Sequence, residues 1–166
     1  MHSTVGIVLN KTDVGEAETV FSIFTKDFGK IRALGQGIKK QGAKLKGHLE
    51  VLNLSAVHFV VGRYGERMVG AEMVQGWESI RGDLIKLKCA WHIKELVDRS
   101  LFERQCDEPL WNFLSANFIF LEEHPMSGAS IHEFVQSFEE KFLSLMGYDG
   151  EENIETLGVA RANFPL

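Results

Sequence analysis

The spacing of apolar residues changes once along this chain of 166 residues, near residue 78, and that change constrains the fold more than any other feature. Before it, short runs either alternate between apolar and polar residues or are rich in β-branched residues, which is typical of strands. After it, apolar residues recur every three or four positions, which is typical of amphipathic helices. The sequence therefore predicts an α+β protein in which a strand-rich part precedes a helical part.

The first part of the chain is predicted to form five strands within about 75 residues, separated by turns. The expected strands are residues 5–9, 19–25, 29–34, 49–62 and 67–75. The fourth run is long for a strand, so we expect a bend or bulge in it, which would let a small sheet curl. Short strands at this spacing favour a small closed or partly open β-barrel.

The second part is predicted to form three helices at residues 79–104, 110–123 and 131–146. Ser130 and Glu133 match a capping box at the start of the third helix, and Gly147 matches its end. The last residues show weak periodicity. We therefore expect a barrel domain at 1–78, a helical domain at 79–148 and a C-terminal tail at 149–166.

A basic stretch lies between the second and fourth predicted strands, at residues 28–47, and contains six cations, five glycines and no acid. Its cations are Lys30, Arg32, Lys39, Lys40, Lys44 and Lys46. Arg63 and Arg67 flank the turn before the fifth predicted strand. A loop of this kind is often only solvated. However, small barrels of this kind bind nucleic-acid strands across one face and with their loops. We therefore predict that these eight residues form a DNA-binding site.

Three aromatic residues near these cations, Phe28, Phe59 and Tyr64, are available as surfaces on which bases could stack. The aromatic residues of the helical part recur at helical spacing, so we interpret them as core.

The charge is unevenly divided between the two halves of the chain. Residues 1–82 hold 11 Lys/Arg and 8 Asp/Glu, a balance of +3, whereas residues 83–166 hold 7 and 15, a balance of −8. This asymmetry indicates two parts with different partners. The alternative is an ordinary acidic protein whose charges are merely uneven.

Motifs for catalysis and cofactor binding are absent from the sequence. There is no phosphate-binding P-loop, dinucleotide fingerprint or HExxH pair. Cys89 and His92 are three residues apart on a predicted helix, but zinc needs about two more ligands, and only Cys106 and His124 are plausible. We therefore predict no metal, no cofactor and no enzyme activity. Two cysteines and no long apolar run favour a cytoplasmic protein that does not span a membrane.

Several segments together resemble the N-terminal domain of the RecO family of DNA repair and recombination proteins. The similar segments are 15–17 (GEA), 25–30 (TKDFGK), 35–46 (the basic loop), 47–51 (GHLEV), 72–77 and 142–148 (FLSLMGY). Val51 replaces the proline that is usual in the family, and the family's four-cysteine zinc site is missing. The chain also stops soon after Tyr148, so the resemblance is to a divergent, shortened member.

The resemblance implies an OB-fold followed by a helical domain, and a non-enzymatic mediator of homologous recombination. Such proteins bind single- and double-stranded DNA, anneal complementary strands, and work with RecR and with single-stranded-DNA-binding protein. A second hypothesis stays open, in which the chain is a protein-interaction module that has kept the fold and no longer binds DNA usefully. Salt-dependent affinity for oligonucleotides separates the two.

Overall fold

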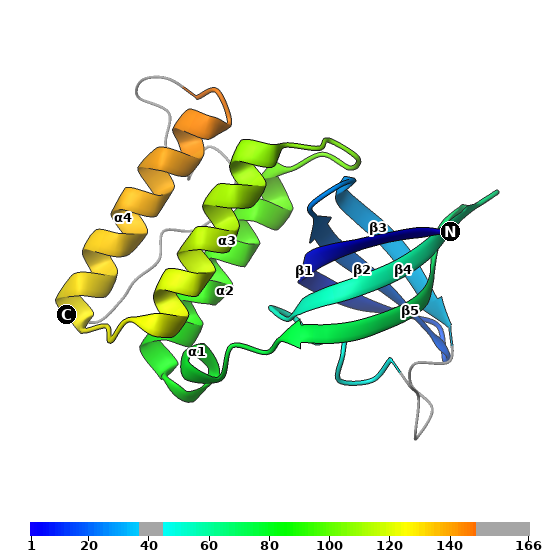
Figure 1. The fold of residues 1–166 in the computed structure, drawn as a ribbon, viewed down its shortest axis with the longest axis horizontal. Coiled ribbons are helices and arrows are strands. Elements are labelled where there is room, and N and C mark those ends of the chain that lie inside the picture. The colour runs from blue at the N-terminus through cyan, green and yellow to red at the C-terminus, as the bar shows by residue number, and fades with distance from the viewer. Residues whose placement is uncertain (37–44, 149–166) are drawn as a thin grey trace. The chain divides into compact units, whose positions relative to one another are not determined.

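The computed structural model describes residues 1–36 and 45–148, which form five strands and four helices (Figure 1). The predicted tail at 149–166 lies outside the described residues. The chain divides into two compact units, and the first contains Met1–Gly76 together with Leu101–Asp107. The second contains Trp77–Ser100 and the chain from Glu108 onward. The predicted α+β class is confirmed.

The strands of the first unit form a closed barrel in the order β1-β2-β3-β5-β4, with β4 pairing back to β1. They are β1 (His2–Val14), β2 (Glu18–Thr25), β3 (Gly29–Gln36), β4 (Leu54–Gly62) and β5 (Gly65–Gln75). Strands β3 and β5 pair in parallel, at Ala33 with Glu66 and Leu34 with Arg67, whereas the other pairs are antiparallel. The prediction of a five-stranded, OB-like barrel is confirmed.

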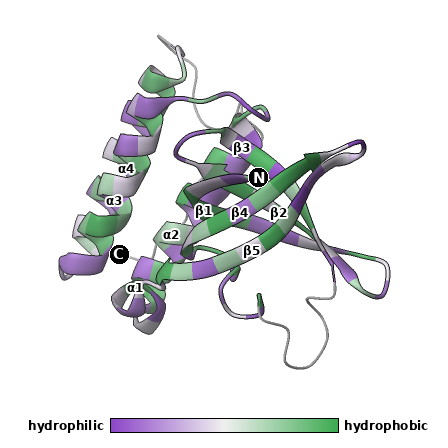
Figure 2. Ribbon diagram, turned by 45° about the vertical axis from the view of Figure 1, so that its right-hand side comes forward, coloured by the Kyte–Doolittle hydropathy of each residue, from purple (hydrophilic) through white to green (hydrophobic). Residues whose placement is uncertain are grey.

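Alternate residues of each strand fill the barrel, as the pleat requires. On β3, Ile31 and Ala33 are buried inside, whereas Arg32 and Gln36 are exposed outside. Figure 2 shows hydrophobic and hydrophilic residues together along β5, as expected for a strand with one buried face. The buried residues of the barrel core are Val8, Phe21, Ile23, Ile31, Ala33, Leu49, Val57, Phe59 and Met68.

The predicted strand at 49–62 is wrong in its first part, because β4 begins only at Leu54. Leu52 has a φ of 77°, which a strand does not accommodate. The chain here bonds to β1 instead, from Val8 N to Asn53 O at 3.0 Å and from Leu52 N to Val8 O at 2.8 Å. Leu49 is thereby buried in the barrel core, and the register of β1 shifts between Val8 and Asn10.

The predicted helix at 79–104 is also wrong, because two helices occupy this region and both end before residue 101. They are α1 (Glu78–Gly82) and α2 (Leu84–Ser100). Asp83 between them is extended, and its Oδ1 accepts hydrogen bonds from Ile85 N and Lys86 N. The first backbone N–H groups of a helix have no carbonyl acceptor within that helix. Asp83 supplies the acceptor for two of them and therefore caps the start of α2.

The remaining helices are α3 (Glu108–Glu123) and α4 (Gly128–Leu145). Helix α4 begins earlier than predicted, and its capping box is formed by Ser127 and Ser130 rather than by Ser130 and Glu133. In the described part of the chain, none of the helices has the length and apolar character needed to cross a membrane.

Most of the helical aromatic residues pack in the core of the second unit, as expected. The Phe113 and Phe138 rings stack with centroids 4.9 Å apart, and Phe118 is fully buried. Trp91 and Phe120 are exceptions, because they are 45% and 41% exposed, and Trp91 lies beneath the Lys94 ammonium.

The Glu122 carboxylate of α3 stabilises the first turn of α1. Its two oxygens accept hydrogen bonds from Ser79 N and Ile80 N, both at 3.0 Å. We expect Glu122→Ala to lower the free energy of unfolding by about 1–2 kcal/mol, because these N–H groups lose a charged acceptor. Chemical denaturation followed by circular dichroism measures this. Glu123→Ala, at an exposed neighbour, is the control, and equal losses in both variants would contradict the capping role.

Candidate nucleic-acid interface

The outer face of β2 and β3 carries the first group of predicted site residues. Antiparallel pairing sets Ser22 opposite Arg32 and Glu18 opposite Gln36. Because alternate residues of β3 share this face, Lys30 lies on it too. Arg32 is exposed and Lys30 is half-buried. In OB-folds this face, with the loops that join β1 to β2 and β4 to β5, is the surface that binds oligonucleotides.

The parallel pairing of β3 with β5 brings Arg67 to the same face, opposite Leu34. The Arg67 guanidinium donates from Nη2 to Gln36 Oε1 at 2.6 Å. The Gln36 amide in turn donates from Nε2 to Glu18 Oε1 at 3.0 Å. A chain of hydrogen bonds therefore crosses three strands, and it holds the exposed Arg67 side chain in one place.

Arg63 and Tyr64 form the tight turn between β4 and β5, where Gly62 pairs with Gly65. The Tyr64 ring is 95% exposed, and the Arg63 guanidinium carbon lies 5.7 Å from its centroid. A cleft of about 390 Å³ opens beside this turn. It is lined by Leu34, Gln36, Gly62, Arg63, Tyr64, Gly65, Glu66 and Arg67.

Of the three aromatic residues suggested as stacking surfaces, only Tyr64 is in a position to stack. Phe59 is 1% exposed, inside the barrel. Phe28 is half-buried, with its ring 5.3 Å from Phe59 and 5.1 Å from His2 between centroids. The expectation is therefore corrected for Phe28 and Phe59, because both rings are used in packing.

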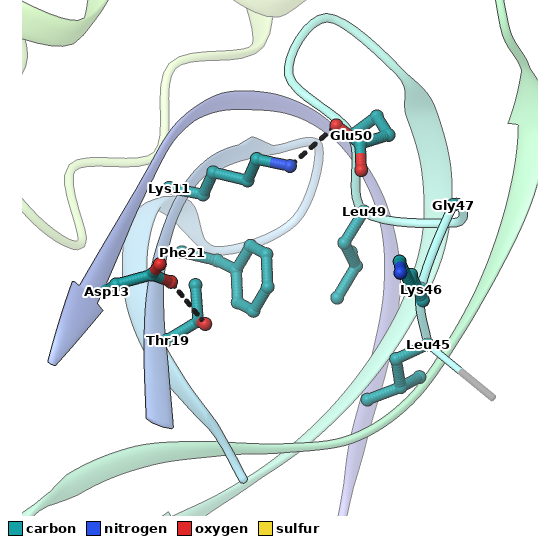
Figure 3. Close-up of a pocket in the computed structure, with 9 residues that line it drawn as sticks. All are labelled: Lys11, Asp13, Thr19, Phe21, Leu45, Lys46, Gly47, Leu49 and Glu50. Atoms are coloured by element: carbon teal, nitrogen blue, oxygen red, sulfur yellow. Dashed lines mark hydrogen bonds and ion pairs between the residues drawn. The ribbon is translucent and has the colours of Figure 1, made fainter. Parts of the chain in front are cut away.

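Lys46 lies at a different cleft, of about 300 Å³, between β1, β2 and the segment that precedes β4 (Figure 3). Phe21 and Leu49 point toward each other at its centre (Figure 3). Lys11 Nζ is 2.6 Å from Glu50 Oε2, and Asp13 also lines the cleft, so its acids balance its bases. It therefore suits the phosphate backbone of DNA less well than the cleft beside the β4–β5 turn, which is lined by Arg63 and Arg67. Three predicted residues, Lys39, Lys40 and Lys44, lie outside the described residues.

Residues Leu101–Asp107 pack on β3, which sequence reasoning missed because it extended a helix through this segment. Arg104 N donates to Lys30 O at 2.8 Å, and Lys30 and Glu103 form a parallel bridge. The Arg104 guanidinium pairs with Glu66, a carboxylate that is only 9% exposed. The segment thus supplies Glu66 with its counter-ion, beside the arginine-lined face. The sequence signal was weak: acids at 103, 107 and 108 interrupt the apolar periodicity.

Glu103 brings a negative charge to the predicted DNA-binding face, because its Oε1 is 3.8 Å from Arg32 Nε. Both side chains are about half exposed, so the pair contributes at most about 1 kcal/mol. We expect Glu103→Gln to raise the affinity for single-stranded DNA by up to about fivefold. The reason is that Arg32 no longer has to break its ion pair with Glu103 before it binds a phosphate. Fluorescence anisotropy measures the change. Glu133→Gln, on an exposed site of α4, is the control and should leave affinity unchanged.

The sulfur and imidazole considered as metal ligands are engaged within the helical unit. Cys89 is fully buried, and burial, together with the nearby Glu139 charge, raises the pKa of its thiol to about 12. Metals bind the thiolate, so this environment disfavours coordination. His92 Nε2 is 2.6 Å from Glu139 Oε1. Within residues 1–36 and 45–148, no three His, Cys, Asp or Glu side chains are grouped closely enough to hold a metal ion. That the protein needs no zinc stays a prediction.

A closed OB-like barrel with arginines along its outer face defines the class of this chain, and comparison with known proteins gives the family. Residues 1–77 match the family described as "Recombination protein O N terminal". The chain is 30% identical over 145 residues to the DNA repair protein RecO of Geobacter metallireducens, an alignment that covers 87% of this chain and 58% of that protein. It is 28% identical over 148 residues to the DNA repair protein RecO of Dehalococcoides mccartyi, covering 89% and 57%.

The DNA repair protein RecO of Acetivibrio thermocellus is 29% identical over 145 residues, covering 87% of this chain and 57% of that protein. Residues 1–77 therefore carry the N-terminal domain of the RecO family, and the similarity to DNA repair proteins of that name extends over most of the chain. It spans a little more than half the length of these relatives.

Proposed function

We propose that this protein is a non-enzymatic DNA-binding protein of recombinational repair, which holds single-stranded DNA across the outer face of β2, β3 and β5. The observation that carries the proposal is that Arg63 and Arg67 line one cleft together with the exposed Tyr64 ring, while Arg32 is exposed on the neighbouring strand β3. The relatives named as DNA repair proteins support the biological setting.

The chemistry of binding follows from the side chains present. A guanidinium presents a planar set of donors that matches a phosphate, and it stays charged at every physiological pH. Phosphate contacts position a strand without reading its sequence, so binding should be independent of sequence. Neutralising the backbone charge also lowers the repulsion between two strands, which is what annealing of complementary strands requires.

The remaining parts of the proposal come from the family. We assign DNA binding to a domain at 1–78 and protein contacts to a helical domain at 79–148. RecR and single-stranded-DNA-binding protein are the proposed partners, double-stranded DNA is a second ligand, and the bacterial cytoplasm, where the chromosome lies, is the proposed location. No step of bond making or breaking is assigned to any residue.

A titration of single-stranded DNA at a series of salt concentrations tests the proposal. If three phosphates of a single strand are neutralised, log affinity should fall with log salt at a slope of about −2. The slope should be steeper if Lys39, Lys40 and Lys44 also contact phosphates. Binding that is absent at low salt, or that is independent of salt, would remove the proposal.

The second candidate function is a protein-interaction module built on the helical unit. Large apolar side chains are exposed there, including Leu84 at 67% and Ile119 at 46%. With a local charge of −8 over residues 83–166, such a surface suits a partner that is basic rather than DNA. This candidate leads if the salt titration finds no DNA binding.

A further inference from the structure

We propose that the cleft beside the β4–β5 turn holds one unpaired nucleotide, with its base on the Tyr64 ring and its phosphate on Arg63 and Arg67. This inference rests on the proposed function and deepens it, because it makes the cleft the source of a preference for single strands over duplex. The cleft volume of about 390 Å³ is at the lower end of the range that holds small ligands, so it suits one nucleotide.

The base would bind at Tyr64, which is presented by a turn rather than packed. Gly62 pairs with Gly65 at the base of the turn, and Gly65 has a φ of 113°, which favours glycine. Single exposed aromatics are common on protein surfaces and need no function. Tyr64 differs because it lines a cleft together with the half-buried Leu34. A flat base in this cleft would have both an aromatic ring and an aliphatic side chain to contact.

The phosphate would bind at the two arginines on the rim. Arg67 uses one N–H in its bond to Gln36, and a guanidinium has five N–H donors, so others face solvent. Gln36 uses its carbonyl for Arg67 and its amide N–H for Glu18. Gln36 is thus a positioning residue that acts through Arg67. The Arg63 guanidinium lies over one face of the Tyr64 ring, so the base would stack on the other face and the Arg63 side chain would turn from the ring to the phosphate.

The preference for single strands follows from which contacts a duplex can make. Phosphates are available in both forms of DNA, so the arginines serve both. The faces of paired bases are already stacked on their neighbours, and exposing one has a cost in free energy. Tyr64 should therefore strengthen binding to single strands alone.

The experiment compares a single-stranded oligonucleotide with the duplex of the same sequence, at one fixed salt concentration. Tyr64→Ala should weaken single-strand binding by about tenfold, since one stacked base is lost, and change duplex binding by less than about twofold. Tyr64→Phe keeps the ring and should bind like the parent protein. Ile119→Ala, at an apolar side chain that is 46% exposed on α3, is the matched control and should change neither affinity.

A second readout reports stacking directly. An oligonucleotide that carries a fluorescent adenine analogue should lose emission on binding the parent protein and Tyr64→Phe, and lose much less with Tyr64→Ala. The inference would be overturned if Tyr64→Ala bound single strands as the parent does, or if it weakened binding to single strands and to duplex equally. In either case salt-dependent binding of DNA by the parent would leave the proposed function in place. A parent protein that binds no DNA at low salt would overturn both.

Discussion

A Gly29→Ala variant is expected to lose about 2–5 kcal/mol of the free energy of unfolding of the barrel unit. Gly29 has a φ of 66°, where an L residue costs about 1–2 kcal/mol. A Cβ at this position would also lie 2.9 Å from Cys106 N and closer still to the Gln105 carbonyl, both of them backbone atoms that cannot rotate away. Forcing that contact apart adds about 1–3 kcal/mol. Chemical denaturation measures the loss.

Gly15→Ala is the matched control for this prediction. Gly15 has nearly the same φ, 65°, but a Cβ there would have no atom within 4 Å. It should therefore lose only the backbone part, about 1–2 kcal/mol. The difference between the two variants isolates the packing of Leu101–Asp107 on β3. If both lose the same amount, that packing contributes nothing to stability.

Gly29 also gives a structural reason for one of the segments that resemble the RecO family, residues 25–30. Thr25 Oγ1 donates to Gly29 O at 2.7 Å and accepts from Phe28 N at 3.1 Å, so the threonine closes the turn between β2 and β3. The glycine then admits the segment 101–107. Two of the positions that carry the resemblance thus serve the barrel, whereas Lys30 lies on the predicted DNA-binding face.

The sequence predicted the interior of the barrel strands well, because alternation is a local pattern. Ile31, Arg32 and Ala33 could be placed inside, outside and inside without knowledge of the neighbouring strands. The ends of elements were harder to predict. Residues 49–53 are as apolar as a strand, but the positive φ of Leu52 and its bond to Val8 depend on β1, which is distant in sequence.

The candidate site was predictable as a set of cations and not as an arrangement. Charge and turn chemistry pointed to Arg63 and Arg67. The chain of bonds from Arg67 through Gln36 to Glu18 depends on the parallel register of β3 and β5, and no local pattern encodes a parallel register. The approach of Glu103 to Arg32 is equally non-local, since the two residues are separated by most of the barrel sequence.

The largest effect on function is expected from neutralising the three arginines of the barrel face together. Each phosphate contact on a single strand contributes about 0.7 to the salt slope, which is about tenfold in affinity at 50 mM salt. The Arg32→Gln, Arg63→Gln, Arg67→Gln variant should therefore bind single-stranded DNA about a hundred- to a thousandfold more weakly at that salt, with a salt slope reduced by about 2. A surface substitution usually changes the free energy of unfolding by no more than about 0.5 kcal/mol, so the triple variant should lose less than about 1.5 kcal/mol.

Two further variants with the same change in net charge give that result its meaning. One neutralises the loop lysines Lys39, Lys40 and Lys44, and we expect it to weaken binding uniformly across sequences and to flatten the slope as well. The other neutralises Arg81, Lys88 and Lys141, exposed residues of the helical unit, and should leave affinity nearly unchanged. A global effect of charge would weaken all three variants alike, whereas a phosphate track on the barrel weakens only the first two. If the arginine variant binds as the parent does, the barrel face is not the DNA site. DNA binding would then be assigned to Lys39, Lys40 and Lys44 if the variant of these lysines is weakened.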